Sequence, residues 1–196
     1  MKSLLIIAIA SACFVEFSRA VLLDRSLLIQ LYPNYQTEPS FNLRNKSIDS
    51  IGSNTFDGLI NLQRLDLYYN QLTLLDPTLF KDLINLQSLT LYSNQLTSLD
   101  ATIFKDLINL QRLWLDDNQL TTMDPTIFKD LINLKELWLN ENQLTSLDPT
   151  IFKDLINLQY LELSRNQLIT LDQTIFKSLI NLQYLRLEYN NLTLIE

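Results

Sequence analysis

Leu62–Asn85 reads LQRLDLYYNQLTLLDPTLFKDLIN, and this stretch recurs along the chain at a fixed step of 24 residues. Four more full copies and one shortened copy start at Leu86, Leu110, Leu134, Leu158 and Leu182. They fit the frame LxxLxLxxNxLxxLDxxxFxxLIN except at Met123 and at the last two residues, Ile195 and Glu196. Self-similarity at a fixed period is the signature of a repeat protein, in which each unit packs against its neighbours. The sequence therefore predicts a solenoid.

This frame resembles the leucine-rich repeat of the 24-residue type common in extracellular proteins, and the match covers Leu62–Glu196 without a gap. What the resemblance implies is an α/β fold, a right-handed curved superhelix. Its parallel β-sheet would lie on the concave face, with loops or short helical turns on the convex face. The resemblance also implies a non-enzymatic module without a cofactor, since relatives serve as receptor ectodomains, matrix proteins and adhesion molecules. Cysteine-rich caps are usual at both ends of such relatives, and this chain shows neither.

Each place in the frame has a physical role. Leucines at the fourth and sixth places alternate with variable residues, and this period of two predicts a short strand with one face buried. The asparagine after the strand carries a donor and an acceptor that can satisfy backbone groups at the turn. The aspartate marks the next bend, where it can bond to the following backbone. The seven phenylalanines after residue 20 all occupy frame positions and are predicted to be core, with a phenylalanine-lined ligand pocket as the alternative.

The start of the chain, MKSLLIIAIASACFVEFSRA, has the layout of a secretory signal peptide. A basic residue precedes an apolar run from Leu4 to Val15, which is too short to span a bilayer as a helix. We predict cleavage after Ala20, with an N-terminal core helix or a retained anchor as the alternative. Cys13 is the only cysteine, so cleavage would leave a chain without disulfides.

The predicted organisation follows from the frame. Residues 21–37 can cover the open end of the first repeat, and Pro33, Asn34 and Pro39 break any regular element. The predicted boundaries are a signal peptide at 1–20 and a repeat domain at 21–196, divided into an N-terminal cap (21–37), a degenerate first repeat (38–61), five full repeats (62–181) and a partial last repeat (182–196).

The repeats can be compared with one another to separate scaffold from surface. The returning half barely changes between copies, whereas the outward places of the strand and turn differ almost everywhere. These variable places hold both tryptophans and six of the eight tyrosines, and aromatic residues and arginine dominate binding hot spots. The alternative is that the aromatic ladder only stabilises the sheet. We predict a ligand-binding concave face formed by Arg64, Asp66, Tyr68, Tyr92, Arg112, Trp114, Asp116, Asp117, Glu136, Trp138, Asn140, Glu141, Tyr160, Glu162, Tyr184 and Arg186. Trp114 and Trp138 occupy the same place in adjacent repeats, so we expect their rings about 4.8 Å apart and facing solvent.

Composition excludes much catalytic chemistry. The chain has no histidine, and only Gly52 and Gly58 are available for a phosphate-binding loop. Carboxylate chemistry survives, because Asp116 and Asp117 lie one strand from Glu141 and could form a glycosidase-like pair or hold calcium weakly. We predict neither an enzyme nor a metal site.

Charge and the ends of the chain bear on its partners. Losing residues 1–20 would remove Lys2, Arg19 and Glu16 and shift the net charge from −7 to −8. A protein with this negative charge should repel nucleic acid. We therefore expect a secreted protein with a protein ligand, no nucleic-acid partner and no membrane span. Asn45 and Asn191 begin the two glycosylation sequons. The last repeat lacks its returning half, so we also expect either continuation past Glu196 or self-association through this uncapped end.

Overall fold

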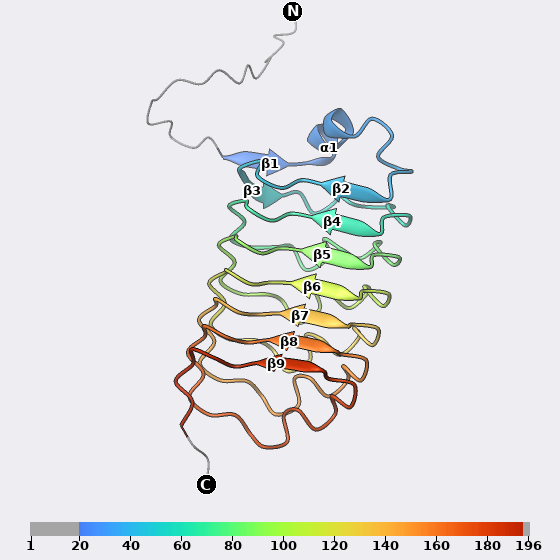
Figure 1. Cartoon of the computed structure of the whole chain (residues 1–196). Coiled ribbons are helices and arrows are strands. Elements are labelled where there is room, and N and C mark those ends of the chain that lie inside the picture. Colours follow the sequence, from blue (N-terminus) through green and yellow to red (C-terminus); the bar gives the residue numbers. More distant parts are fainter. Residues whose placement is uncertain (1–19, 194–196) are drawn as a thin grey trace, which may run out of the picture.

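The computed structural model describes residues 20–193, and the predicted signal peptide (1–20) lies almost entirely outside them. Seven parallel strands stack one below another in a single sheet, with one strand per repeat (Figure 1). In sheet order these strands are β2 (Ser40–Asn42), β4 (Arg64–Asp66), β5 (Ser88–Thr90), β6 (Arg112–Trp114), β7 (Glu136–Trp138), β8 (Tyr160–Glu162) and β9 (Tyr184–Arg186). The pairing register joins residues one repeat apart throughout this sheet, as Trp114 with Trp138. The predicted repeat solenoid is confirmed.

A continuous core runs the length of the solenoid between the sheet and the returning loops. The leucines at the first, fourth and sixth places are fully buried in the middle repeats, as are the phenylalanines of the return. Phe80, Phe104 and Phe128 stack on one another with ring centroids 6.5 Å apart. Phe176, in the last return, is only half-buried because, among the described residues, no further repeat packs over it. The phenylalanines are therefore core residues, as predicted.

The asparagine of each turn holds neighbouring repeats together. The Asn118 amide nitrogen donates to the carbonyls of Leu91 and Leu115 at 3.0 and 3.1 Å, and its Oδ1 accepts from the backbone N–H of Leu96 at 3.0 Å. One buried side chain thus satisfies three backbone groups that have few other partners inside the core. The structural role predicted for these asparagines is confirmed.

The aspartate of the return closes a short turn. Asp124 Oδ1 accepts hydrogen bonds from the backbone N–H and the hydroxyl of Thr126 at 2.8 and 2.6 Å. These hydrogen bonds lower the pKa of Asp124. Asp100, which precedes alanine instead of proline, makes the same contacts with Thr102. The turn therefore depends on the Asp–Thr pair, and proline is dispensable there.

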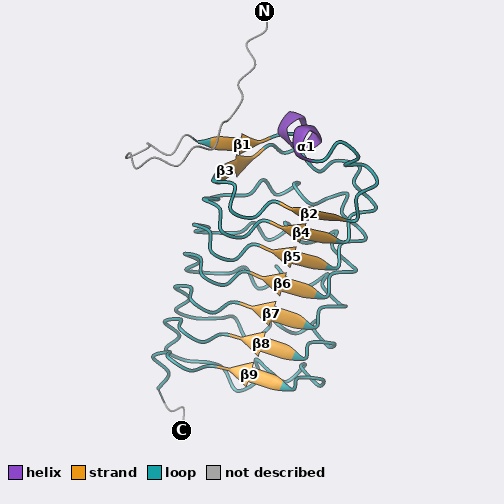
Figure 2. Ribbon diagram, turned by 45° about the horizontal axis from the view of Figure 1, so that its top comes forward, coloured by secondary structure: helices purple, strands orange, loops and turns teal. Residues whose placement is uncertain are grey.

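The N-terminal end is covered by a small cap. β1 (Val21–Leu23) pairs in parallel with β3 (Ile48–Ile51), away from the main sheet (Figure 2). α1 (Arg25–Leu31) follows at once, with the Asp24 side chain accepting from the backbone N–H of Leu27 as its N-cap. Leu23 and Leu28 are fully buried against the first repeat. Val21–Leu31 thus covers this end of the core.

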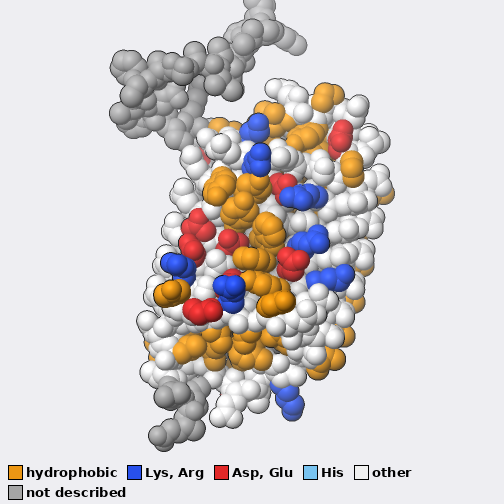
Figure 3. Space-filling view, in the orientation of Figure 1, with side chains coloured by type: hydrophobic (Ala, Val, Ile, Leu, Met, Phe, Trp, Pro, Cys, Tyr) orange, Lys and Arg blue, Asp and Glu red, His pale blue; other side chains and the backbone are white. Residues whose placement is uncertain are grey.

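The opposite end is open among the described residues. β9 forms the last edge of the sheet, and all three of its residues are exposed. Ile180, Tyr184 and Leu185 are 78%, 60% and 38% exposed. Figure 3 shows the corresponding band of hydrophobic side chains below the sheet.

Candidate ligand-binding face

The outward side of the seven-stranded sheet, called here the sheet face, carries an unbroken row of six aromatic rings. We call this row the aromatic stripe. It consists of Tyr68, Tyr92, Trp114, Trp138, Tyr160 and Tyr184. Successive ring centroids lie 4.5, 6.0, 5.8, 4.9 and 5.8 Å apart, in that order. Each ring therefore contacts the ring of the next repeat.

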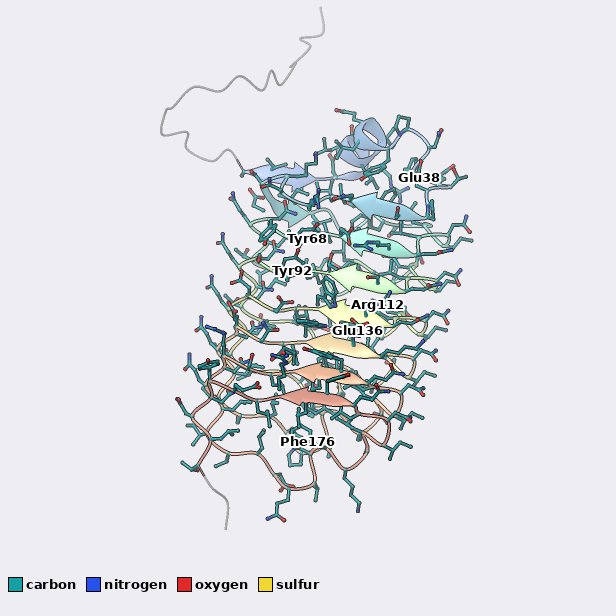
Figure 4. All side chains as sticks on the ribbon, in the orientation of Figure 1. Glu38, Tyr68, Tyr92, Arg112, Glu136 and Phe176 are labelled. Carbon is teal, nitrogen blue, oxygen red and sulfur yellow. The ribbon has the colours of Figure 1, made fainter. Side chains whose placement is uncertain are left out.

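The aromatic stripe crosses the strands obliquely. Its first two rings occupy the seventh place of their repeats, the next two the fifth place and the last two the third place. Figure 3 shows hydrophobic side chains along this oblique path, and Figure 4 shows Tyr68 and Tyr92 displaced along the strand direction from Arg112 and Glu136. The variable columns were identified from the sequence, but the continuity of the rings across columns was missed. The signal was present in the spacing of the six residues, which is 24, 22, 24, 22 and 24.

Charged residues flank the stripe on both sides. On the side where the strands begin, Arg112 donates a hydrogen bond to Glu136 Oε1 at 3.2 Å. On the other side, Arg165 lies 3.7 Å from Glu141, and Asp117 accepts from the hydroxyl of Ser93 at 2.6 Å. These charges are largely exposed. The sheet face thus has an aromatic centre and a charged rim.

Two predicted ligand contacts are less accessible than expected. Asp66 is 5% exposed, because Arg64 and Thr90 both donate hydrogen bonds to its carboxylate. Glu162 is 4% exposed and accepts from the Tyr160 hydroxyl at 3.2 Å, with Arg186 at 3.6 Å. Both carboxylates lie on the sheet face but are covered by their neighbours. They are therefore placed to orient Arg64, Tyr160 and Arg186.

The tryptophan pair also differs from the sequence expectation. The ring centroids of Trp114 and Trp138 are 5.8 Å apart, not 4.8 Å, and the planes are tilted by 55°. Both side chains are half-buried, and both indole Nε1 atoms are shielded from solvent and have no hydrogen-bond partner among the described residues. The expectation of fully solvent-facing rings was wrong, because adjacent aromatic rings cover one another.

A hollow of about 120 Å³ opens where the rings tilt away from one another. We call it the central hollow, and it is lined by Tyr92, Trp114, Asp116 and Trp138. Burial, together with the nearby carboxylates of Asp117, Glu141 and Glu162, raises the pKa of Asp116 to about 6. Burial also raises the pKa of Tyr92 to about 12. Sequence reasoning placed Asp116 on this face but did not reveal that aromatic rings enclose it.

A larger hollow of about 440 Å³ lies on the flank of the solenoid and has a different character. Its lining residues are Asn85, Gln87, Asn109, Gln111, Asn133, Lys135 and Asn157. The asparagines there donate to isoleucine carbonyls of the preceding repeat, as Asn133 does to Ile108 at 2.9 Å. These hydrogen bonds to the backbone explain the asparagines of the flank, and no aromatic residue lines this hollow.

Within residues 20–193, no group of three or more His, Cys, Asp or Glu side chains is arranged to hold a metal ion. The same residues include no helix with the length and apolar character needed to cross a membrane. Asn45 and Asn191 are both exposed, near opposite ends of the solenoid.

A parallel-sheet solenoid built from short, similar units defines the class of repeat proteins, in which each repeat packs on its neighbours. The chain belongs to the Leucine rich repeat family, whose model matches residues 40–96, 84–144, 108–168 and 132–192. No curated protein matches the chain.

Solved structures with the same fold include receptor complexes. The crystal structure of the TLR13–ssRNA13 complex is 34% identical, with a TM-score of 0.72 over 76% of this chain and 21% of that one. The glycosylated Toll–Spatzle complex of Drosophila is 30% identical, with a TM-score of 0.73 over 77% of this chain and 22% of that one. A second Toll–Spatzle structure is 26% identical, with a TM-score of 0.64 over 75% of this chain and 23% of that one. The chain thus spans about a fifth of the length of these similar structures.

Proposed function

We propose that this chain is a secreted, non-enzymatic module that binds a protein ligand through the sheet face. The observation that carries the proposal is the aromatic stripe, six contiguous rings bordered by charged residues. Large aromatic anchors surrounded by a polar rim are the usual anatomy of a protein interface. The similarity to Toll, solved in complex with the protein Spatzle, supports a protein ligand.

A purely structural stripe is the competing explanation, since ring-to-ring contacts also stabilise a sheet. Such pairs contribute only about 0.2–1 kcal/mol each, which any good strand former could supply in part. A stabilising ladder would also be expected to stay in one column, where facing residues are directly paired. The oblique path instead leaves charged residues on both sides, which suits recognition.

A nucleic-acid ligand is less compatible with this surface, although the similar TLR13 structure contains ssRNA. The net charge of the chain is −7, which opposes binding of a phosphate backbone. Single strands also bind by stacking bases on open ring faces. The Tyr68 and Tyr92 rings are 4.5 Å apart and nearly parallel, as are Trp138 and Tyr160 at 4.9 Å, so these rings cover each other's faces.

The proposal is tested by screening the chain against extracellular proteins of its host and retesting each binder on Tyr160→Ala. Tyr160 is the fifth of the six rings of the stripe and lies outside the central hollow. We expect at least tenfold weaker binding, because aromatic anchors of an interface commonly contribute about 2 kcal/mol or more. Lys129→Ala, on the exposed return, is the matched control and should bind normally. Binders that are indifferent to Tyr160→Ala would contradict the proposal.

The alternative function is structural: a self-associating piece of a longer leucine-rich-repeat receptor, adhesion protein or matrix protein. The exposed β9 edge and the hydrophobic band beneath it favour this alternative. Reading the coding sequence beyond Glu196 separates the two, since a membrane span, an anchor signal or a cysteine-rich cap would indicate a receptor.

Secretion has its own test. Material secreted from a eukaryotic host should carry glycans at the exposed Asn45 and Asn191, near opposite ends of the solenoid and clear of the middle of the stripe. Enzymatic deglycosylation should therefore lower its mass. An unchanged mass, or retention of the chain inside the cell, would count against passage through the secretory pathway.

A further inference from the structure

The central hollow lies where successive rings of the aromatic stripe are tilted instead of stacked. Tyr92 and Trp114 are tilted by 49°, and Trp114 and Trp138 by 55°, whereas the flanking pairs on either side are nearly parallel. The first tilt falls where the stripe steps from the seventh to the fifth place of the repeat, and the second lies within the fifth place. Its volume of about 120 Å³ is well above the roughly 10–15 Å³ that one water needs, so it can accept the end of a side chain.

We propose that the central hollow is a receptor for an arginine side chain of the protein ligand, with the guanidinium between the aromatic rings and against the Asp116 carboxylate. This inference rests on the proposed function and names the chemistry at its centre.

The lining chemistry selects a cation. Asp116 is the one charged residue among the four that line the hollow. An apolar occupant would leave its carboxylate buried without an ion-pair partner, and an anion would be repelled. The Nε1 atoms of Trp114 and Trp138 are shielded from solvent, so a group in the hollow cannot contact them. Such a group would contact the ring carbons and the Asp116 carboxylate instead. Ring faces attract cations, and a carboxylate binds them directly.

The surrounding charges leave this position uncompensated. Glu141 is paired with Arg165, and Glu162 with Arg186, but the Asp116 carboxylate forms no ion pair within residues 20–193. A cation from the ligand would supply the missing charge. Between the two common cations, arginine fits better, because its planar group stacks on aromatic rings and forms paired hydrogen bonds with a carboxylate.

The experiment uses the two indole N–H signals of the chain, since Trp114 and Trp138 are the only tryptophans. The ¹⁵N-labelled protein is titrated with Nα-acetyl-arginine methylamide and, in parallel, with the neutral isostere Nα-acetyl-citrulline methylamide. We expect saturable shifts of both indole signals with the arginine compound and none with the citrulline compound. Asp116→Asn should abolish the response, whereas Asp130→Asn, on the returning part of the repeat beside Lys129, should keep it. Equal responses to the two compounds, or no response to either, would overturn the proposal.

The full ligand, once identified, separates this inference from the proposed function. If Tyr160→Ala weakens ligand binding but Asp116→Asn leaves it unchanged, the sheet face binds protein and the arginine site is wrong. If both substitutions leave binding unchanged, the proposed function itself fails. If both substitutions weaken ligand binding, and replacing one arginine of the ligand with glutamine weakens it as well, the result supports both the proposed function and the arginine site.

Discussion

Replacing Asp116 with asparagine should stabilise the protein at neutral pH. The ring-enclosed carboxylate has a pKa of about 6, compared with an ordinary value of 3.8. That difference corresponds to about 3 kcal/mol at 1.36 kcal/mol per pKa unit. Because the side chain is partly open to solvent, screening reduces the expected gain to about 1–2 kcal/mol. The substitution keeps the shape of the side chain and removes only its charge.

The pH dependence of this gain follows from linkage. The unfolded chain releases the Asp116 proton near its ordinary pKa, but the folded protein retains it up to about pH 6. The folded state therefore binds more protons between about pH 4 and 6, and the wild type loses stability as pH rises through this window. Asp116→Asn lacks this loss. The stability difference between the two proteins should be near zero at about pH 4 and reach its full value above about pH 6.

Urea titrations followed by far-UV circular dichroism at several pH values measure this difference. Asp117→Asn is the control, because it removes the same charge from the neighbouring, exposed position. A similar pH profile for both variants would show a general charge effect instead of burial. A stability difference for Asp116→Asn that does not change with pH would refute the assigned environment.

Three further predictions concern the scaffold. Asn118→Ala should lower the free energy of unfolding by about 1–3 kcal/mol in urea titrations, because three buried backbone groups lose a partner. Asn133→Ala, on the flank, should lower it clearly less. Equal losses for the two variants would contradict the structural role of the turn asparagine. Phe128→Ala should lower the free energy of unfolding by about 3–5 kcal/mol in the same assay, and Phe176→Ala should lower it less, since the Phe176 ring is only half-buried. A larger loss for Phe176→Ala would contradict the open end of the core at Phe176. Sedimentation at increasing concentration should show self-association that Ile180→Lys reduces, and a wild type that stays monomeric throughout would contradict association through the exposed end.

Much of the scaffold could be predicted from the sequence because the same residue types make the same contacts in every repeat. Leu113 is buried in β6 and Asn118 bonds three backbone groups for reasons that hold in every copy. Self-comparison therefore identified the core, the turns and the variable face together. The strand pairing of Val21–Leu23 with Ile48–Ile51 was not predictable, since three residues carry too weak a pattern.

The details of the candidate site depend on contacts between columns, which a column-by-column comparison does not reveal. Asp66 is buried because Arg64 and Thr90 bond to it from its own and the next strand. The hollow at Asp116 lies where Tyr92 of one column meets the tilted tryptophan pair of another. Such features follow from the strand register and side-chain shape together, so they emerge only when the repeats are placed side by side.

The most direct test of the central claim is acrylamide quenching of Trp114 and Trp138 with and without a bound protein ligand. Both rings lie in the middle of the aromatic stripe, and the chain has no other tryptophan. If the ligand docks on the sheet face, it will cover the exposed parts of both rings, and quenching should decrease with the same midpoint as binding. A ligand without tryptophan keeps the signal specific to these two residues. Saturating binding of such a ligand with unchanged quenching would show that the sheet face is not the binding surface.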